Sequence, residues 1–269
     1  MITNKFNYPE LKRLNNDLGR FYIDPLNNHV PSVTTVLNNI SDKKTSIDQW
    51  RKRVGDVEAD RVMKEATDIG SMVHLSLENY LNNEDHNVFS QDGIGIMAEG
   101  MSNKLINDSL KDISEVYGLE VHLVLNDLYA GTADCVGILD GEETIIDFKT
   151  SKKIKKKEWI DDYFLQGCAY ANAHNVMFNT NIKQVAILMV DRDLMYKKFI
   201  IKDAEFNHFT NIWKKKLLDF YLFHIIISYK FFLNKLELDY TEILKNKGLY
   251  YVYWEHGRYC NAYERRWFN

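Results

Sequence analysis

The apolar residues in the first 120 positions recur at the spacing of helices. One run covers residues 47–66, a second covers residues 69–81, and a third covers residues 96–117. Apolar side chains three and four positions apart share one face of a helix, so the pattern predicts three helices with one buried face each. Gly118 directly follows the third run, and glycine is the residue type that most often ends a helix.

Strict alternation of apolar residues begins at Leu119 and indicates strands. The odd positions of residues 119–125 are apolar, whereas Glu120 and His122 face the other way. A turn at Asn126-Asp127 then leads to two runs rich in β-branched residues on either side of Asp140-Gly141. Because Asp-Gly is a typical two-residue hairpin turn, the pattern predicts three consecutive antiparallel strands.

Further helices and strands are predicted before and after these segments. Short extended segments are predicted at residues 21–24 and from residue 30. The later elements are predicted as a helix at residues 158–175, hairpin strands at 185–190 and 195–201, and an amphipathic helix capped by Asp203. The composition changes beyond about residue 222, so we expect one domain over residues 1–222 and a C-terminal appendage over residues 223–269.

The predicted central hairpin brings two carboxylates and an amine to one face. A two-residue turn at Asp140-Gly141 pairs residues whose numbers sum to 281, which places Asp134 opposite Asp147. A four-residue loop places Lys149 opposite Asp134 instead, and in both registers the three side chains share a face. Opposed carboxylates repel each other unless a cation or proton lies between them, and such oxygen ligands suit Mg²⁺. A simple ion pair of Lys149 with either aspartate is the alternative.

Three further groups of residues have candidate chemistry. Gly70, His74 and Glu78 share one face of the second helix, where the imidazole could bind a metal or phosphate, or be an ordinary half-buried histidine. The segment 151–157 contains five lysines, which form either a solvated loop or a patch that attracts phosphate. Gln166 and Tyr170 lie one helical turn apart and could contact phosphates or bases, although a tyrosine there is more often part of the core.

Composition narrows the class of protein. The chain has 269 residues, is 45% hydrophobic and carries a formal net charge of −4, so its total charge does not indicate nucleic-acid binding. Its three cysteines form no ligand-spaced pair, and the N-terminus lacks the apolar segment of a signal peptide, so we expect a cytoplasmic protein. The most apolar run, residues 220–233, contains His224 and Lys230 and is too short to span a membrane.

In their order and spacing, these motifs resemble the PD-(D/E)xK nuclease superfamily. The likeness is to its RecB-like exonuclease branch, in particular the phage exonucleases and the mitochondrial genome maintenance exonucleases. The matching segments are Pro31-Ser32-Val33-Thr34-Thr35, Gly70-Ser71-Met72-Val73-His74, Gly131-Thr132-Ala133-Asp134, Asp147-Phe148-Lys149 and Gln166-Gly167-Cys168-Ala169-Tyr170. The resemblance covers roughly residues 20–220 and implies an α/β (α+β) fold with a mixed, mostly antiparallel sheet flanked by helices.

The resemblance also implies roles for single residues. Asp134 and Asp147 correspond to metal-binding carboxylates, and the main-chain carbonyl of Lys149 to a further ligand. The Lys149 ammonium corresponds to the group that positions or activates the attacking water, and His74 to a metal ligand or phosphate contact. Glu120 matches an acidic position of some relatives, but a two-residue turn at Asn126-Asp127 would place it on the wrong face of the sheet.

On this basis we expect a Mg²⁺- or Mn²⁺-dependent exonuclease that acts on single-stranded DNA or DNA ends in replication, recombination or repair. Expected DNA contacts are Gln166, Tyr170, Thr150, Ser151 and Lys152. Some relatives hold an iron–sulfur cluster with four cysteines. Here Cys135 lies within the hairpin and Cys260 alone lies in the C-terminal tail, so we expect no cluster.

The sequence leaves other functions open. A non-catalytic DNA-binding module on the same fold, a domain that binds another phosphorylated ligand, and a structure-specific endonuclease are the alternatives. The last 21 residues interleave aromatic residues with Arg258, Arg265 and Arg266, a pattern compatible with stacking on single-stranded bases or with a small packing tail.

Overall fold

A five-stranded sheet forms the centre of the first of two compact units. The computed structural model describes residues 2–3, 5–16, 19–39 and 43–235, and the side chains of these except 43–45 and 225–235. The first unit covers residues 1–214 and the second covers residues 215–269. All the candidate site residues named above, apart from the C-terminal arginines, belong to the first unit.

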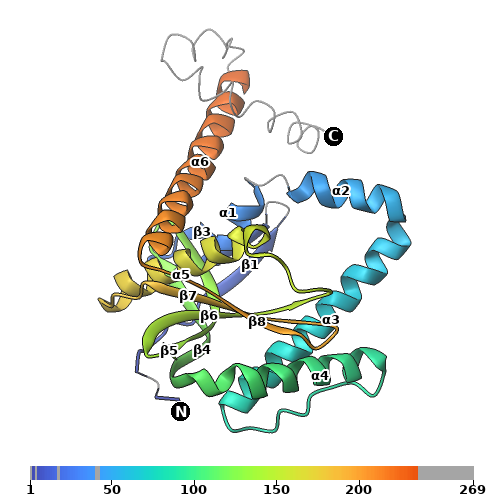
Figure 1. Ribbon diagram of the computed structural model, residues 1–269. Coiled ribbons are helices and arrows are strands. Elements are labelled where there is room, and N and C mark those ends of the chain that lie inside the picture. The colour runs from blue at the N-terminus through green and yellow to red at the C-terminus, as the bar shows by residue number, and fades with distance from the viewer. Residues whose placement is uncertain (1, 4, 17–18, 40–42, 236–269) are drawn as a thin grey trace. The chain divides into compact units, whose positions relative to one another are not determined.

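The elements follow the order labelled in Figure 1. The strands are β1 (Lys12–Asn16), β2 (Gly19–Ile23), β3 (His29–Pro31), β4 (Ile113–Leu125), β5 (Tyr129–Leu139), β6 (Glu142–Ser151), β7 (Gln184–Asp191) and β8 (Tyr196–Lys202). The helices are α1 (Val33–Asn39), α2 (Lys43–Val54), α3 (Asp56–Leu81), α4 (Gly93–Asp108), α5 (Asp161–Phe178) and α6 (Asp203–Lys235), with 3₁₀ turns η1 (Leu110–Asp112) and η2 (Lys157–Trp159).

The central sheet is mixed and mostly antiparallel, as predicted. Its strands lie in the order β4-β5-β6-β7-β8, and β1, β2 and β3 form a separate three-stranded sheet. Within the central sheet β6 and β7 are parallel and the other neighbours are antiparallel. The parallel pair follows from the chain path, because α5 returns the chain to the starting end of β6 before β7 begins.

Helices cover both faces of this sheet (Figure 1). On one face, Ile146 and Phe148 pack with Val73 of α3 and Met101 of α4 in a single apolar cluster. On the other face lies α5, which approaches so closely that a Cβ on Gly167 would lie 2.2 Å from a methyl carbon of Val185. Because side chains alternate along β6, Asp147 and Lys149 point to the face that α5 covers.

The predicted central hairpin is confirmed in both turn and register. Asp140 and Gly141 have φ values of 52° and 84°, the left-handed conformation that a two-residue turn of this kind requires. Val136 pairs with Ile145 and Leu139 with Glu142, which is the register in which residue numbers sum to 281. The hairpin of β7 and β8 is also present at the predicted place.

Two predicted helix boundaries are wrong. The break expected between residues 66 and 69 does not occur, because Thr67 bonds back to the Met63 carbonyl and Lys64 pairs with Asp68 within the continuous helix α3. The chain instead breaks at Gly55, where φ is 84°. This conformation ends α2 and sets the direction of α3.

The third predicted helix is also too long. The helix ends at Asp108 rather than at residue 117, and directly after this end the Ser109 hydroxyl donates to the Leu105 carbonyl. Residues Ile113–Leu125 form β4 instead. Gly118 therefore does not end a helix but pairs with Val136 in the sheet. A Cβ there would lie 2.7 Å from the ring of Tyr8, so glycine at this position allows the N-terminal segment to approach β4.

The close contact of α5 with β7 gives a first prediction. Gly167→Ala should lower the free energy of unfolding by about 1–3 kcal/mol, because the new methyl group overlaps Val185 in a closely packed interior. Urea denaturation measures this change. Gly93→Ala is the matched control, since a Cβ at Gly93 meets no atom within 4 Å, and it should change stability by less than about 1 kcal/mol. Equal stability of Gly167→Ala and the parent protein would contradict this packing.

Candidate metal and catalytic site

The candidate site lies where β5 and β6 stop pairing with each other. Their ladder runs from Leu139 and Glu142 only as far as Cys135 and Ile146. Just beyond this last pair, the Phe148 N–H donates to the Asp134 carboxylate at 2.9 Å. A side-chain oxygen therefore replaces a main-chain acceptor of the ladder at this point, which fixes the Asp134 carboxylate beside β6.

Asp147 and Lys149 form a buried ion pair next to this point. The Lys149 ammonium donates to Asp147 Oδ1 at 2.6 Å, and the second carboxylate oxygen, Oδ2, is buried with no hydrogen-bond partner among the described residues. Burial, opposed by Lys149 and aided by Asp134, raises the pKa of Asp147 above its ordinary value. Burial alone would lower the pKa of Lys149, but Asp147 and Asp134 together raise it, so the amine is protonated.

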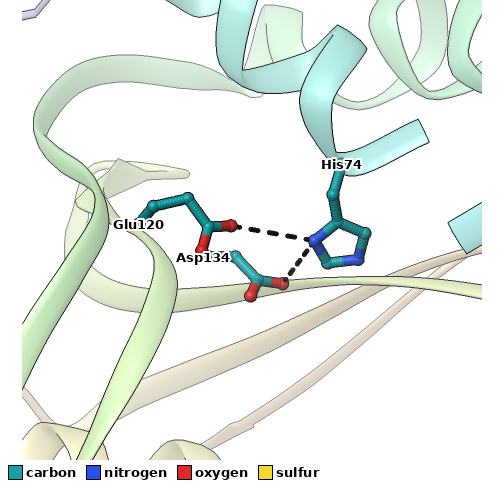
Figure 2. A group of neighbouring side chains, drawn as sticks. All are labelled: His74, Glu120 and Asp134. Carbon is teal, nitrogen blue, oxygen red and sulfur yellow. Dashed lines mark ion pairs between the residues drawn. The ribbon is translucent and has the colours of Figure 1, made fainter. Parts of the chain in front are cut away.

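Figure 2 shows His74 of α3 facing two carboxylates from neighbouring strands. Its Nδ1 atom lies 3.6 Å from Asp134 Oδ2 and 3.9 Å from Glu120 Oε1. One ligand atom from each of the three residues fits within 4.8 Å of the others. An imidazole nitrogen and two carboxylate oxygens at this spacing could hold a divalent ion.

The sequence placed Glu120 on the wrong face of the sheet, and the structure corrects this. The loop between β4 and β5 contains three residues, 126–128, rather than two, with Asp127 at a φ of 63°. Pairs across the two strands, such as Leu119 with Cys135 and Val121 with Ala133, therefore differ by one position from the expected register. A shift of one residue moves every side chain to the opposite face, so Glu120 lies beside Asp134.

His74 pairs with carboxylates from the sheet rather than from its own helix. Glu78 shares its helix face, but the acidic partners of His74 in the described residues are Asp134 and Glu120. Burial would lower the pKa of His74, whereas the charges of Asp134 and Glu120 raise it, and the net shift is upward. Burial and the nearby Glu120 in turn raise the pKa of Glu78. Acidic groups thus outnumber cations around the imidazole, an imbalance that a bound cation would relieve.

Two proteins with sequences similar to this chain are named as exonucleases. The proteins named Mitochondrial genome maintenance exonuclease 1 from Xenopus tropicalis and from Homo sapiens are 28% and 29% identical to it over 238 and 205 residues. The predicted resemblance to RecB-like exonucleases is confirmed. The aligned segments cover 81% and 71% of this chain, and the chain spans 66% and 57% of the length of the two relatives.

Other comparisons add less. No protein-family model matches the chain. A crystal structure from Eubacterium rectale, described as a candidate exonuclease, overlaps 58% of this chain and 67% of its own with a TM-score of 0.43 and 16% sequence identity. The similarity to RecB-like exonucleases therefore rests on the two sequence relatives, and the fold class on the sheet described above.

The expected DNA contacts lie around this site but differ in exposure. Gln166 donates to the Tyr170 hydroxyl at 3.0 Å, and Tyr170 is buried against Gly131, where a Cβ would lie 2.5 Å from its ring. Gly131 thus lets the tyrosine ring pack closely on β5, which fits a role in shaping the site. Thr150 and Ser151 are half-buried at the end of β6, and Lys152 directly after them is exposed.

Several expectations stay predictions. Cys260, Arg258, Arg265 and Arg266 lie outside the described residues, so the expected absence of an iron–sulfur cluster and the role of the tail are untested. The domain boundary at residue 222 and the cytoplasmic location are also untested. Among the described residues, no helix combines the length and apolarity needed to cross a membrane.

The pair of carboxylates beside His74 gives a second prediction. In metal-free protein, Glu120→Gln should lower the pKa of His74, because one of the two anions that stabilise the imidazolium is lost. An NMR pH titration of the histidine side chains in EDTA measures this change. The stability that these pairs add is fully present below the ordinary histidine pKa of about 6.5 and is lost as pH rises through the raised pKa.

The matched control is Glu99→Gln, which removes an exposed carboxylate from α4. This variant should leave the His74 titration unchanged. If Glu120→Gln also leaves it unchanged, Glu120 does not act on the imidazole, and its place in the candidate metal site is wrong.

Proposed function

We propose that this chain is a metal-dependent deoxyribonuclease that hydrolyses phosphodiester bonds at the ends of DNA strands. The observation that carries the proposal is the grouping of Asp134, Asp147 and Lys149, with His74 and Glu120 beside them, where β5 and β6 part. The names of the two sequence relatives support the same reaction class. A role in DNA replication, recombination or repair follows from that class.

The residues present fit a divalent ion. Asp147 Oδ2 is buried without a partner among the described residues, which is costly for a carboxylate oxygen unless something binds it. Three carboxylates, from Glu120, Asp134 and Asp147, face one ammonium and one imidazole. Hard oxygen donors suit Mg²⁺ or Mn²⁺, and we propose His74, Glu120, Asp134 and Asp147, with the main-chain carbonyl of Lys149, as the ligands.

When bound, such an ion neutralises charge on the phosphate and lowers the pKa of a water bound to it. The protein contributes the rest of the mechanism. The Lys149 ammonium acts as a hydrogen-bond donor that orients the attacking water and stabilises the developing negative charge. Asp147 holds that ammonium at 2.6 Å, so the position of the donor is set before substrate arrives. The products would carry a 5′-phosphate and a 3′-hydroxyl.

DNA is the proposed substrate, in single-stranded form or at free ends. Lys152 is exposed directly beyond the site, and the hydroxyl groups of Thr150 and Ser151 lie at the end of β6 beside Lys149. These groups could donate to phosphates on either side of the scissile bond. Gln166 is half-buried one helical turn from Tyr170, and we propose that it contacts the strand while Tyr170 supports it.

The arrangement of Asp147 and Lys149 gives a third prediction. Asp147→Asn and Lys149→Gln should each reduce the rate of DNA cleavage in Mg²⁺ by at least about 10²-fold, because the first removes the charge of a proposed metal ligand and the second removes the ammonium that stabilises the developing negative charge. Release of nucleotides from an end-labelled oligonucleotide measures the rate, and circular dichroism checks that each variant is folded. Lys183→Gln and Glu99→Gln, both exposed, are the controls and should cleave at the parental rate. Full activity in either site variant would refute the assignment.

The proposed dependence on metal and on strand ends gives a fourth prediction. Linear DNA should be degraded in Mg²⁺ or Mn²⁺ and not in EDTA, since one ammonium and one imidazole do not balance three carboxylates and cannot replace a divalent ion at the phosphate. Circular single-stranded DNA should resist the protein, because it offers no end. Cleavage of the circle would show an endonuclease, and binding of either DNA without cleavage in any metal would show a non-catalytic module.

A further inference from the structure

An exposed indole side chain lies in the segment that joins β6, which carries part of the candidate site, to α5. Trp159 ends the 3₁₀ turn η2, and 66% of its surface is exposed. Single exposed apolar residues are common on proteins and need no function of their own. Trp159 differs from such residues because hydrogen bonds and an ion pair hold the main chain around it, and because a lysine lies over its ring.

The main chain on both sides of Trp159 is anchored. The next residue, Ile160, is only 1% exposed, and the Trp159 N–H donates to the Lys156 carbonyl at 3.0 Å. Lys157 is tied by its ammonium to Glu205 at 2.6 Å and to the Ile200 carbonyl at 3.3 Å. The turn is therefore held on the protein body while the indole points away from it, as a preorganised binding surface requires.

The charges around Trp159 are unevenly balanced. Of the five lysines in residues 152–157, Lys153 pairs with Asp193 and Lys157 with Glu205. The amines of Lys152, Lys155 and Lys156 have no carboxylate partner in the part of the chain that the structure describes. Lys156 lies 5.4 Å from the centroid of the Trp159 ring. Lys156 thus lies over the exposed aromatic face, and the amines of Lys152 and Lys155 precede it in the chain. The carboxylates of Glu158, Asp161 and Asp162, in contrast, gather at the start of α5.

Contacts lead from the candidate site to Lys155, which directly precedes Lys156 in the chain. The Lys149 ammonium, paired with Asp147, lies 5.1 Å from the ring centroid of Tyr163 on α5. Lys155 lies 4.9 Å from the same ring and donates to the Tyr163 hydroxyl at 2.7 Å. Lys156 follows in the chain and lies over Trp159. The three lysines Lys149, Lys155 and Lys156 therefore mark a path along which a phosphate backbone could run.

We infer that Trp159 is a stacking platform for an unpaired base of the DNA strand whose phosphates contact Lys155 and Lys156. The inference rests on the proposed function, from which it takes DNA as the substrate. It adds Trp159 as a residue that favours single strands. Every base has a flat π-face, so stacking on an indole tolerates any sequence. The bases of a duplex are already stacked on each other, so the platform favours a single-stranded segment beside the site.

Binding measured without cleavage tests the platform. Fluorescence anisotropy in EDTA, with the full chain, would compare fluorescein-labelled oligothymidylate with an abasic strand of the same length and charge. Trp159→Ala should weaken binding of oligothymidylate by about 5- to 150-fold, the effect expected for losing one stacked base. The same variant should leave binding of the abasic strand unchanged, and Trp159→Phe should retain most of the affinity.

Salt dependence separates the platform from the lysines. Trp159→Ala should leave the slope of log affinity against log salt unchanged, whereas Lys156→Gln should reduce it by about 0.7, the value for one phosphate contact to a single strand. Val176→Ala, which shortens another exposed apolar side chain (68% exposed on α5), is the matched control and should bind as the parent does.

The outcomes for the platform and for the nuclease are distinct. Parental affinity of Trp159→Ala for oligothymidylate, or equal weakening for the abasic strand, would overturn the platform even if the protein cleaves DNA. Selective weakening for oligothymidylate in a protein that cleaves no DNA would support the platform and overturn the proposed hydrolysis alone.

Discussion

The hydrogen bond from the Phe148 N–H to the Asp134 carboxylate is the contact on which the candidate site depends. It occurs at the position where the β5–β6 ladder ends, so one carboxylate is fixed between two strands that no longer pair. His74 from α3 reaches this position and lies 3.6 Å from the same carboxylate oxygen. The separation of the two strands thus lets groups from both sides of the sheet meet at its end.

Electrostatics explains why such a site needs a partner from solution. Asp147 is buried with one carboxylate oxygen paired to Lys149 and the other without a partner in the described structure. Buried charges that lack a full set of partners are costly, and functional sites are where proteins retain them. The acidic excess at His74, Glu120 and Asp134 adds to the same cost. A cation bound to these oxygens would relieve both costs.

Lysines are concentrated in one segment of this negatively charged chain. In this chain, the segment from Lys152 to Lys157 lies between β6, which provides the site, and α5, which covers that face of the sheet. Two of its lysines form ion pairs that hold the segment on the body, whereas Lys156 is exposed and lies over Trp159. The lysines that position the segment and the one that lies over Trp159 are therefore different residues.

The sequence by itself determined the central hairpin, the face shared by Asp134, Asp147 and Lys149, and the resemblance to RecB-like exonucleases. These follow from local rules: Asp140-Gly141 fixes its own turn, and alternation along a strand fixes which side chains lie together. The sequence did not predict the helix ends at Gly55 and Asp108, because the helical spacing of apolar residues continues past both positions. The helices end there because of the main-chain conformation at Gly55 and the hydrogen bond of Ser109.

Only the tertiary structure decided the place of Glu120 and the surroundings of Trp159. A loop of three residues instead of two moved Glu120 to the face of Asp134, and that difference depends on how β4 pairs with β5 rather than on the residues near Glu120. The exposure of Trp159 likewise depends on which neighbours are buried, such as Ile160, and on where Lys157 finds Glu205. Contacts between residues far apart in the chain set both, and no local pattern encodes them.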